Sequence, residues 1–348
     1  MKSTVITAAL AALLGLGACA GAHAGAHAGT YAVVQKYRLG GAGGWDYLSF
    51  DAAGRRLFIS RGTHVQVVDA QSGKIVGDIP DTPGVHGIAL AHDLGKGYIS
   101  NGAGNSVTVF SLADLHVIAT VATPDGSGPD FIAYDAASRQ VLAFNGRSRN
   151  ATVIDAATDR PVATIALAGK PEAAAGDGAG RMFVNIEDRS EIAVIDLVRH
   201  AVVATWPVAG CDEPSALSID RAHHRLYAGC HNRTMAVVDS RDGHRVALLP
   251  IGAGVDANAY DERDGLVFSS QGDGSLTIVE QQAPDRYAVL QNVATVFGAR
   301  TMALDAAHHR VYLVTADLEP AAAASAGQRQ RRKAVPDSFT LIVVAARP

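Results

Sequence analysis

Cysteine, aromatic residues and long apolar runs are all scarce in this sequence. Three of its 348 residues are Cys, so a scaffold held together by many disulfides is excluded. Aromatic residues make up 6% of the chain, which argues against an extended stacking surface for single-stranded nucleic acid. The apolar stretch from Val5 to Leu16 is shorter than the ~20 residues that a transmembrane helix needs. No later segment keeps a period near 3.6, so we expect almost no helix beyond this stretch.

An excess of basic residues is also missing. Lys and Arg number 30 against 34 Asp and Glu, and the two signs are dispersed along the chain. Proteins that neutralise phosphates usually carry a basic face, so a nucleic-acid partner is not expected. The motifs G-x-S-x-G and H-E-x-x-H of serine and zinc hydrolases do not occur either. The sequence therefore identifies no catalytic residue by motif.

The N-terminus has the features of an export signal. Lys2 precedes the apolar stretch, and Ala22-His23-Ala24 and Ala26-His27-Ala28 are small-x-small sites for a signal peptidase. These features predict that residues 1–28 are a signal peptide and that the mature protein is periplasmic or secreted. The alternative is a lipoprotein signal that ends before Cys19, because Leu16-Gly17-Ala18-Cys19 resembles a bacterial lipobox. In that case an N-terminal lipid on Cys19 would anchor the protein to the envelope.

The two remaining cysteines favour a disulfide. Cys211 and Cys230 stand 19 residues apart and flank a strand–turn–strand unit, which could bring them side by side. The oxidising compartment predicted from the N-terminus fits this pairing. A metal site formed with His231 is the weaker alternative, because the short C-x-x-C spacing of zinc motifs is absent.

A repeat of about forty-two residues organises the rest of the chain. An Asp that follows a short apolar strand recurs seven times, with gaps of 42, 42, 42, 43, 41 and 44 residues. These residues are Asp51, Asp93, Asp135, Asp177, Asp220, Asp261 and Asp305. Each unit contains four short β-branched runs separated by turn residues, which is typical of a propeller blade.

We therefore predict a single domain over residues 29–348, an all-β, seven-bladed propeller with four antiparallel strands per blade. The last unit lacks a fourth strand, whereas Tyr31 to Leu39 is a strand that precedes the first unit. Because unpaired sheet edges are unfavourable, that spare strand is expected to complete the last blade and close the ring. The innermost strands are expected to carry small side chains. Residues 319–337, rich in Ala, Pro and charge, are expected to form a disordered loop.

The repeat resembles the YVTN repeat of the YncE-like bacterial propellers. The similarity lies in Asn150-Ala-Thr-Val-Ile-Asp-Ala-Ala-Thr158 and in Asn101-Gly-Ala-Gly-Asn-Ser-Val-Thr-Val109, and it extends over residues 31–348. The four residues that give the repeat its name, Tyr-Val-Thr-Asn, do not occur here as such. The corresponding positions read Tyr98-Ile-Ser-Asn101 and Phe183-Val-Asn-Ile186. The resemblance implies an exported propeller. It also links such proteins to ligand binding, cell-surface association and, for one relative, DNA binding, but it supplies no catalytic set.

Candidate site residues follow from the repeat, because loops at one end of a propeller surround one mouth of the channel. Loops that lead into the first strands carry Asp46, His86, Asp130, Glu172, Glu213, Asp256 and Arg300. Loops that follow the second strands carry Arg61, Asn101, Asn145, Glu187, His231 and Gln271. The predicted ligand-binding set is His86, Asn101, Asn145, Glu172, Glu187, Glu213, His231, Asp256 and Arg300. Trp45 is a candidate for stacking on a ligand, whereas Trp206 is expected to pack within the fold.

Two functions compete at this mouth. The first is an exported binding scaffold, without an assigned reaction, that recognises a small molecule or an envelope protein and is a monomer. The alternative is a metal-dependent lyase or hydrolase in which His86, His231 and Glu187 hold a divalent metal, since imidazole and carboxylate are suitable ligands. DNA binding in the envelope rests on the resemblance alone, and the net charge of −4 opposes it.

Overall fold

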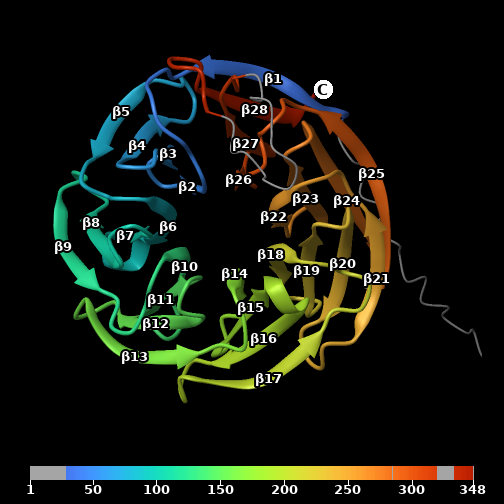
Figure 1. Cartoon of the computed structure of the whole chain (residues 1–348). Helices are drawn as coiled ribbons and strands as arrows, with labels where there is room; N and C mark the ends of the chain where they lie inside the picture. Colours follow the sequence, from blue (N-terminus) through green and yellow to red (C-terminus); the bar gives the residue numbers. More distant parts are fainter. Residues whose placement is uncertain (1–28, 284, 320–332, 348) are drawn as a thin grey trace, which may run out of the picture.

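Seven four-stranded antiparallel sheets stand like blades around a central channel in the computed structural model, which describes residues 29–283, 285–319 and 333–347 (Figure 1). The first blade consists of β2 (Leu48–Asp51), β3 (Arg56–Ser60), β4 (Val65–Asp69) and β5 (Ile75–Ile79), and the second of β6 (Val85–Ala91), β7 (Lys96–Asn101), β8 (Ser106–Ser111) and β9 (Val117–Ala122). The third consists of β10 (Pro129–Asp135), β11 (Gln140–Asn145), β12 (Asn150–Asp155) and β13 (Arg160–Ala166), and the fourth of β14 (Pro171–Gly176), β15 (Arg181–Ile186), β16 (Glu191–Asp196) and β17 (Ala201–Pro207). The last three are β18 (Pro214–Asp220), β19 (Arg225–Cys230), β20 (Thr234–Asp239) and β21 (Arg245–Pro250); β22 (Val255–Asp261), β23 (Leu266–Gln271), β24 (Ser275–Ala283) and β25 (Arg286–Ala294); and β26 (Met302–Asp305), β27 (Arg310–Thr315), β28 (Thr340–Ala346) and β1 (Tyr31–Arg38). Two short 3-10 turns, η1 (His92–Leu94) and η2 (Glu187–Arg189), are the only helical segments in the described residues. The predicted fold class is confirmed.

Ring closure occurs as the sequence predicts. Strand β1 pairs antiparallel with β28, with Tyr31 opposite Ala346 and Arg38 opposite Thr340. The last blade thus takes three strands from the end of the chain and its outermost strand from the beginning (Figure 1). This pairing leaves no blade with a missing strand.

Burial of each strand follows its radial position. The second and third strands of a blade are covered on both faces by neighbouring blades, and their side chains are buried almost without interruption, as in β11 and β12. The outermost strands, such as β9, are mostly exposed. Aromatic rings join adjacent blades, as when Phe58 meets Phe110 with ring centroids 5.4 Å apart. The core is therefore a series of layers between blades rather than one central cluster.

The channel is not lined by small side chains alone. Gly87, Ala173 and Ala257 do lie on its wall, but Tyr47 and Phe131 project into it and meet edge to face at 5.4 Å. Gly87 belongs to β6, the innermost strand of the blade that lies between the blades of Tyr47 and Phe131. A Cβ at that position would stand 3.0 Å from Ile132 Cγ2 and 3.1 Å from the Asp130 carbonyl oxygen, so glycine permits the close approach of β6 and β10.

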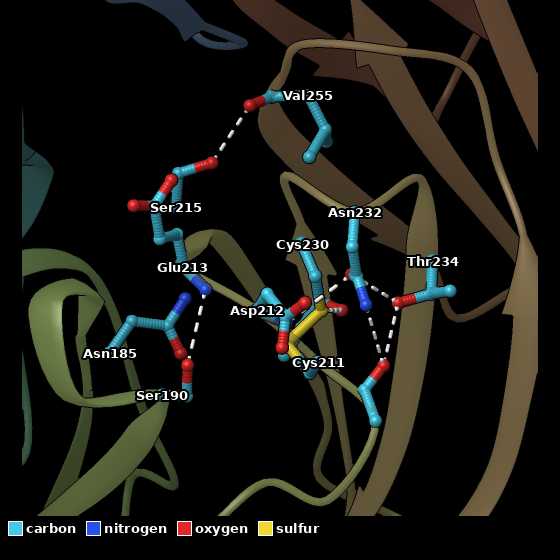
Figure 2. The surroundings of a disulfide bond; sticks show 12 residues. Asn185, Ser190, Cys211, Asp212, Glu213, Ser215, Cys230, Asn232, Thr234 and Val255 are labelled. Carbon is cyan, nitrogen blue, oxygen red and sulfur yellow. Dashed lines mark hydrogen bonds between the residues drawn. A yellow bond between two sulfur atoms is a disulfide. The ribbon is translucent and has the colours of Figure 1, made fainter.

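The predicted disulfide joins Cys211, in the loop before β18, to Cys230, at the end of β19 (Figure 2). Its Cα atoms are 5.3 Å apart, within the range that a disulfide requires. Both cysteines are buried, and Asn232 Nδ2 donates a hydrogen bond to the neighbouring Gly210 carbonyl oxygen at 3.1 Å. The bond is compatible with an oxidising, exported location.

Two predicted segments lie partly or wholly outside the described residues. Residues 1–28, which contain both predicted signal endings, lie wholly outside them. Of the loop expected over residues 319–337, residues 320–332 lie outside them. The two ends of that loop pair with each other, since Leu318 and Ala334 form a bridge and Glu319 N donates to Lys333 O at 2.9 Å. Within the described part of the chain, no helix has the length and apolarity to cross a membrane.

We expect the double variant Cys211→Ser/Cys230→Ser to be less stable than the oxidised protein by about 3 kcal/mol, the loop-closure value for a crosslink over 19 residues. Denaturant unfolding of both proteins measures the difference. Reducing agent should lower the midpoint of the wild type and leave that of the variant unchanged. Equal midpoints, with the disulfide verified by mass spectrometry, would contradict this account.

Candidate functional site

Charged residues from several blades converge where the chain enters the innermost strands. Asp46, His86, Asp130, Glu172, Asp256 and Arg300 all precede or begin first strands, and they lie together with Lys170 and Glu187. We call these eight residues the mouth cluster. The sequence anticipated seven of them.

Side chains from preceding blades hold the backbone of the mouth cluster in place. Ser100 Oγ donates to the carbonyl oxygen of Asp130, and Ser270 Oγ donates to that of Arg300. Thr301 Oγ1 donates to the carbonyl oxygen of Asp46 at 2.7 Å. The charged side chains therefore extend from a backbone that is fixed between blades, which is the usual way a rigid scaffold positions a site.

His86 lies between two carboxylates from different blades. Its Nδ1 is 2.6 Å from Asp46 Oδ2 and 3.5 Å from Asp130 Oδ1. One ligand atom from each of these three residues falls within 4.8 Å of the other two. Imidazole and carboxylate oxygens are ligands for divalent transition metals, so this trio could hold such an ion.

Two basic side chains bridge the other carboxylates. Arg300 Nε is 2.5 Å from Asp256 Oδ2, and its Nη2 is 3.6 Å from Asp46 Oδ1. Lys170 Nζ contacts Glu172 and is 2.6 Å from Glu187 Oε2. The mouth cluster thus contains five carboxylates and only two residues that are always cationic near neutral pH.

Burial, with a smaller contribution from neighbouring carboxylates, raises the pKa of three acids in the mouth cluster. Burial raises the pKa of Glu172 to about 9, the charges of Asp130 and Glu187 add to the rise, and Lys170 opposes it. Burial likewise raises the pKa of Asp256 to about 6, with Arg300 opposing the rise and Asp46 adding to it. For Asp130, burial again raises the pKa, against the nearby His86. The site would lower its energy by taking up protons or another cation.

Two hollows adjoin the mouth cluster. A pocket of about 880 Å³ has Asp46, His86 and Arg300 on one side and the aromatic residues Trp45 and Phe297 among its other walls. A smaller cavity of about 170 Å³ lies farther down the channel, beside Tyr47, Phe131 and Asp256. Burial raises the pKa of the Tyr47 phenol well above its usual value, and four carboxylates of the mouth cluster add to this effect. The larger pocket has the size of a small-molecule site.

Several predicted site residues have other contacts. Asn101 is fully buried and donates to Ser106 Oγ and Thr108 Oγ1 within its own hairpin, and Asn145 does the same with Asn150 and Thr152. Gln271 is buried in the equivalent position, where it accepts hydrogen bonds from Ser275 and Thr277. These amides stabilise the hairpins and do not face the channel mouth.

Three charged candidates also lie apart from the mouth cluster. The guanidinium of Arg61 is buried over the Phe339 ring at 3.5 Å, and its Nη2 donates to Ala42 O. His231 Nδ1 is 3.0 Å from Glu213 Oε2, and neither residue has a described contact with His86. Of the predicted metal ligands His86, His231 and Glu187, only His86 belongs to a group that brings ligand atoms within 4.8 Å in the described part of the chain.

Sequence reasoning missed Lys170, Tyr47, Phe131 and Phe297. Lys170 lies two residues before Glu172, but the repeat was used to choose one residue per loop. Tyr47 follows Asp46 directly, and Phe131 follows Asp130, so the same position of the repeat could have indicated both. Trp45 borders the larger pocket, whereas Trp206 packs against Phe183, as expected.

Comparisons with known proteins define the class of this chain without identifying a family. No family model matches the sequence, and no curated protein matches it. A chain of the mitotic checkpoint complex matches the structure with a TM-score of 0.74 at 12% identity, over 99% of both chains. A chain of hydrazine synthase from Kuenenia stuttgartiensis matches with a TM-score of 0.69 at 16% identity, over 78% of this chain and 92% of that one.

These similarities establish a seven-bladed β-propeller and nothing finer. At such low identities the shared property is the fold, and 1768 chains of solved structures match it, so the fold alone selects no activity. The resemblance to YVTN-repeat propellers stays a prediction beyond that shared fold.

The raised pKa of Glu172 predicts a pH-dependent stability. Between its unfolded value of 4.5 and its folded value of about 9, the folded state binds the proton and the unfolded state releases it. The free energy of unfolding should therefore fall as pH rises through this window, by up to about 1.4 kcal/mol per pH unit. Glu172→Gln should remove this contribution between pH 6 and pH 8, as measured by denaturant unfolding.

Glu191→Gln in the same blade is the matched control, because Glu191 is paired with Arg189 outside the mouth cluster. It should keep the slope of the wild type. An unchanged slope in Glu172→Gln would show that Glu172 titrates near its ordinary value.

Proposed function

We propose that this protein is an exported binding propeller whose channel mouth holds a small organic cation, an ammonium compound with an apolar part. The observation that carries the proposal is the excess of partly enclosed carboxylates over fixed positive charges in the mouth cluster. These carboxylates are Asp46, Asp130, Glu172, Glu187 and Asp256. With Glu172 protonated near neutral pH, as its pKa of about 9 implies, the other four carboxylates still outnumber Lys170 and Arg300. An ammonium group would neutralise this excess, and charge-assisted hydrogen bonds to carboxylates are strong.

The larger pocket supplies surroundings for the rest of such a ligand. Trp45 and Phe297 line the same pocket as Asp46 and His86, and aromatic rings provide apolar area and attract cations. Sites for small molecules commonly combine an apolar wall with a few directed polar groups. Because the sequence contains no recognised nucleophile motif, binding is favoured over a reaction.

We expect tyramine or choline to raise the melting temperature, whereas uncharged analogues of the same shape, tyrosol and 3,3-dimethylbutan-1-ol, should have no effect. Asp46→Asn should weaken binding of tyramine by about tenfold or more, because a charge-assisted hydrogen bond is lost. Isothermal titration calorimetry measures both affinities. Asp242→Asn, at an exposed turn where Asp242 pairs with His244, is the control and should bind as the wild type does.

Equal affinity for an amine and its uncharged analogue would contradict a site selective for cations. If neither tyramine nor choline binds to a protein that circular dichroism shows to be folded, the proposed class of ligand is wrong.

A metal-dependent lyase or hydrolase is the second candidate, favoured by the grouping of Asp46, His86 and Asp130. These three residues replace the trio of His86, His231 and Glu187 as the better ligand set. This candidate predicts that the purified wild type holds about one equivalent more metal than His86→Ala, as measured by mass spectrometry of the elements. His231→Ala should keep the wild-type content, and equal content in His86→Ala would eliminate this centre.

A further inference from the structure

The Asp that ends or follows the innermost strand has a side-chain hydrogen-bond partner within its own turn in five of the seven blades. A donor three to five residues later approaches its Oδ2 atom and thereby satisfies a carboxylate that is largely buried. The pairs are Asp51 with Arg56 at 2.7 Å, Asp135 with Ser138 Oγ at 2.7 Å, Asp177 with Arg181 at 2.8 Å, Asp220 with His223 at 2.7 Å and Asp305 with His308 at 2.8 Å. The repeat itself thus shows what this position normally requires.

The second and sixth blades depart from that rule. Asp93 of the second blade is exposed and accepts a hydrogen bond from Tyr134 of the next blade, whereas Asp261 of the sixth blade is buried. The residue three positions after Asp261 is a second acid, Asp264, where three other blades have a donor, Ser138, His223 or His308. Opposite Asp261 in the strand register lies Leu266, whereas an Arg holds the equivalent place in three other blades, as Arg56, Arg225 and Arg310. Both of the usual sources of a donor or positive charge are therefore replaced.

Asp261 consequently has a buried oxygen that lacks a hydrogen bond. Its side chain is 0% exposed, and Oδ1 accepts the backbone N–H of Arg263 at 3.0 Å. Oδ2 has no hydrogen-bond partner in the described residues. Leaving a carboxylate oxygen buried without a donor costs free energy, so this atom indicates a missing partner.

His309 of the seventh blade faces this oxygen and that of Asp264. Its Nδ1 is 2.9 Å from Asp264 Oδ2 and 3.5 Å from Asp261 Oδ2, yet it forms no hydrogen bond of acceptable geometry with either. Ligands held about 2.1 Å from one metal ion are separated by roughly 3.0–3.4 Å. The two distances from His309 Nδ1 lie within 0.1 Å of that range, and all three ligand atoms are within 4.8 Å of one another, so a small adjustment would place them around a shared cation.

We propose that Asp261, Asp264 and His309 form a binding site for a divalent transition metal, with zinc as the representative ion. Two carboxylates and one imidazole suit zinc better than magnesium or calcium, which prefer all-oxygen sites. Somewhat more than a third of His309 and about a third of Asp264 are exposed, so an ion can enter from solvent while Asp261 forms the floor. The metal would complete the coordination with water.

The charges of two proposed ligands act on Tyr31. Burial raises the pKa of Tyr31 to about 12, and the charges of Asp264 and Asp261 add to the rise. Tyr31 belongs to β1, the strand that closes the ring. A cation held by the three ligands would therefore link the sixth blade to the seventh beside the closure.

This site is separate from the mouth cluster. Strand β22 begins beside Asp256 in the mouth and ends at Asp261, so the two sites lie at opposite ends of the same strand. The zinc site does not depend on the proposed cation-binding function, and either can fail without the other.

The test uses the metal-free protein after chelation, in a His86→Ala background that removes a ligand of the mouth. Titration calorimetry with zinc chloride should give one equivalent bound, and zinc at one hundred times its Kd should raise the melting temperature by on the order of 5 °C. Adding His309→Ala should weaken zinc binding by roughly one hundredfold, and adding Asp264→Asn by at least roughly tenfold. His308→Ala is the matched control, since the adjacent His308 pairs with Asp305 and not with this group.

Each outcome decides the proposal. One equivalent that is lost with His309 and Asp264 and kept with His308 supports it. If His309→Ala fails to fold by circular dichroism, Asp264→Asn alone decides. Absence of zinc binding in the His86→Ala protein, or an unchanged Kd in Asp264→Asn, would overturn the site and leave an ion pair between blades. Tighter binding of magnesium than of zinc would overturn the assigned class of metal.

Discussion

The pairing of β1 with β28 is the constraint on which the rest of the structure depends. A blade buries both faces of its middle strands only when a neighbour covers each side, so every blade needs the ring to be complete. An open ring would expose the apolar layer between its first and last blades together with unpaired strand edges. Because the closing strand comes from the opposite end of the chain, stability is shared around the whole ring rather than confined to one segment.

Closure also creates the site. Residues that are about forty-two positions apart in sequence become neighbours at the channel mouth because each innermost strand begins at the same end of the ring. Hydroxyl groups of Ser100, Ser270 and Thr301 hold the backbone there. The resulting concentration of carboxylates is unfavourable for the fold, as the raised pKa of Glu172 indicates, and such clusters are often found at functional sites.

The repeat provides an internal reference against which each blade is compared. Asp51, Asp177 and Asp220 each receive a basic partner from their own turn, so the exception at Asp261 stands out without any comparison with other proteins. The same reasoning removes Asn101 and Asn145 from the ligand-binding face, because both occupy one repeated structural position. Regular positions in this protein maintain the blades, and departures from the repeat mark places where chemistry can differ.

The sequence by itself determined the number of blades, the closing strand and the disulfide. Each of these follows from periodic spacing or from strand patterns, which depend on local geometry and recur in every unit. Six residues of the mouth cluster could be chosen from first-strand loops in the same way, and Glu187 could be chosen from a second-strand loop.

Only the tertiary structure decided which side chains face the mouth and which turn inward. Asn101 and Gln271 hydrogen-bond within their own hairpins and His231 pairs with Glu213, although Asn101, Gln271 and His231 all lie at or just after the end of a second strand. Spacing along the chain specifies the position of a backbone atom. The direction of its side chain depends on the donors, acceptors and room that neighbouring strands supply, and those are set when the blades pack together.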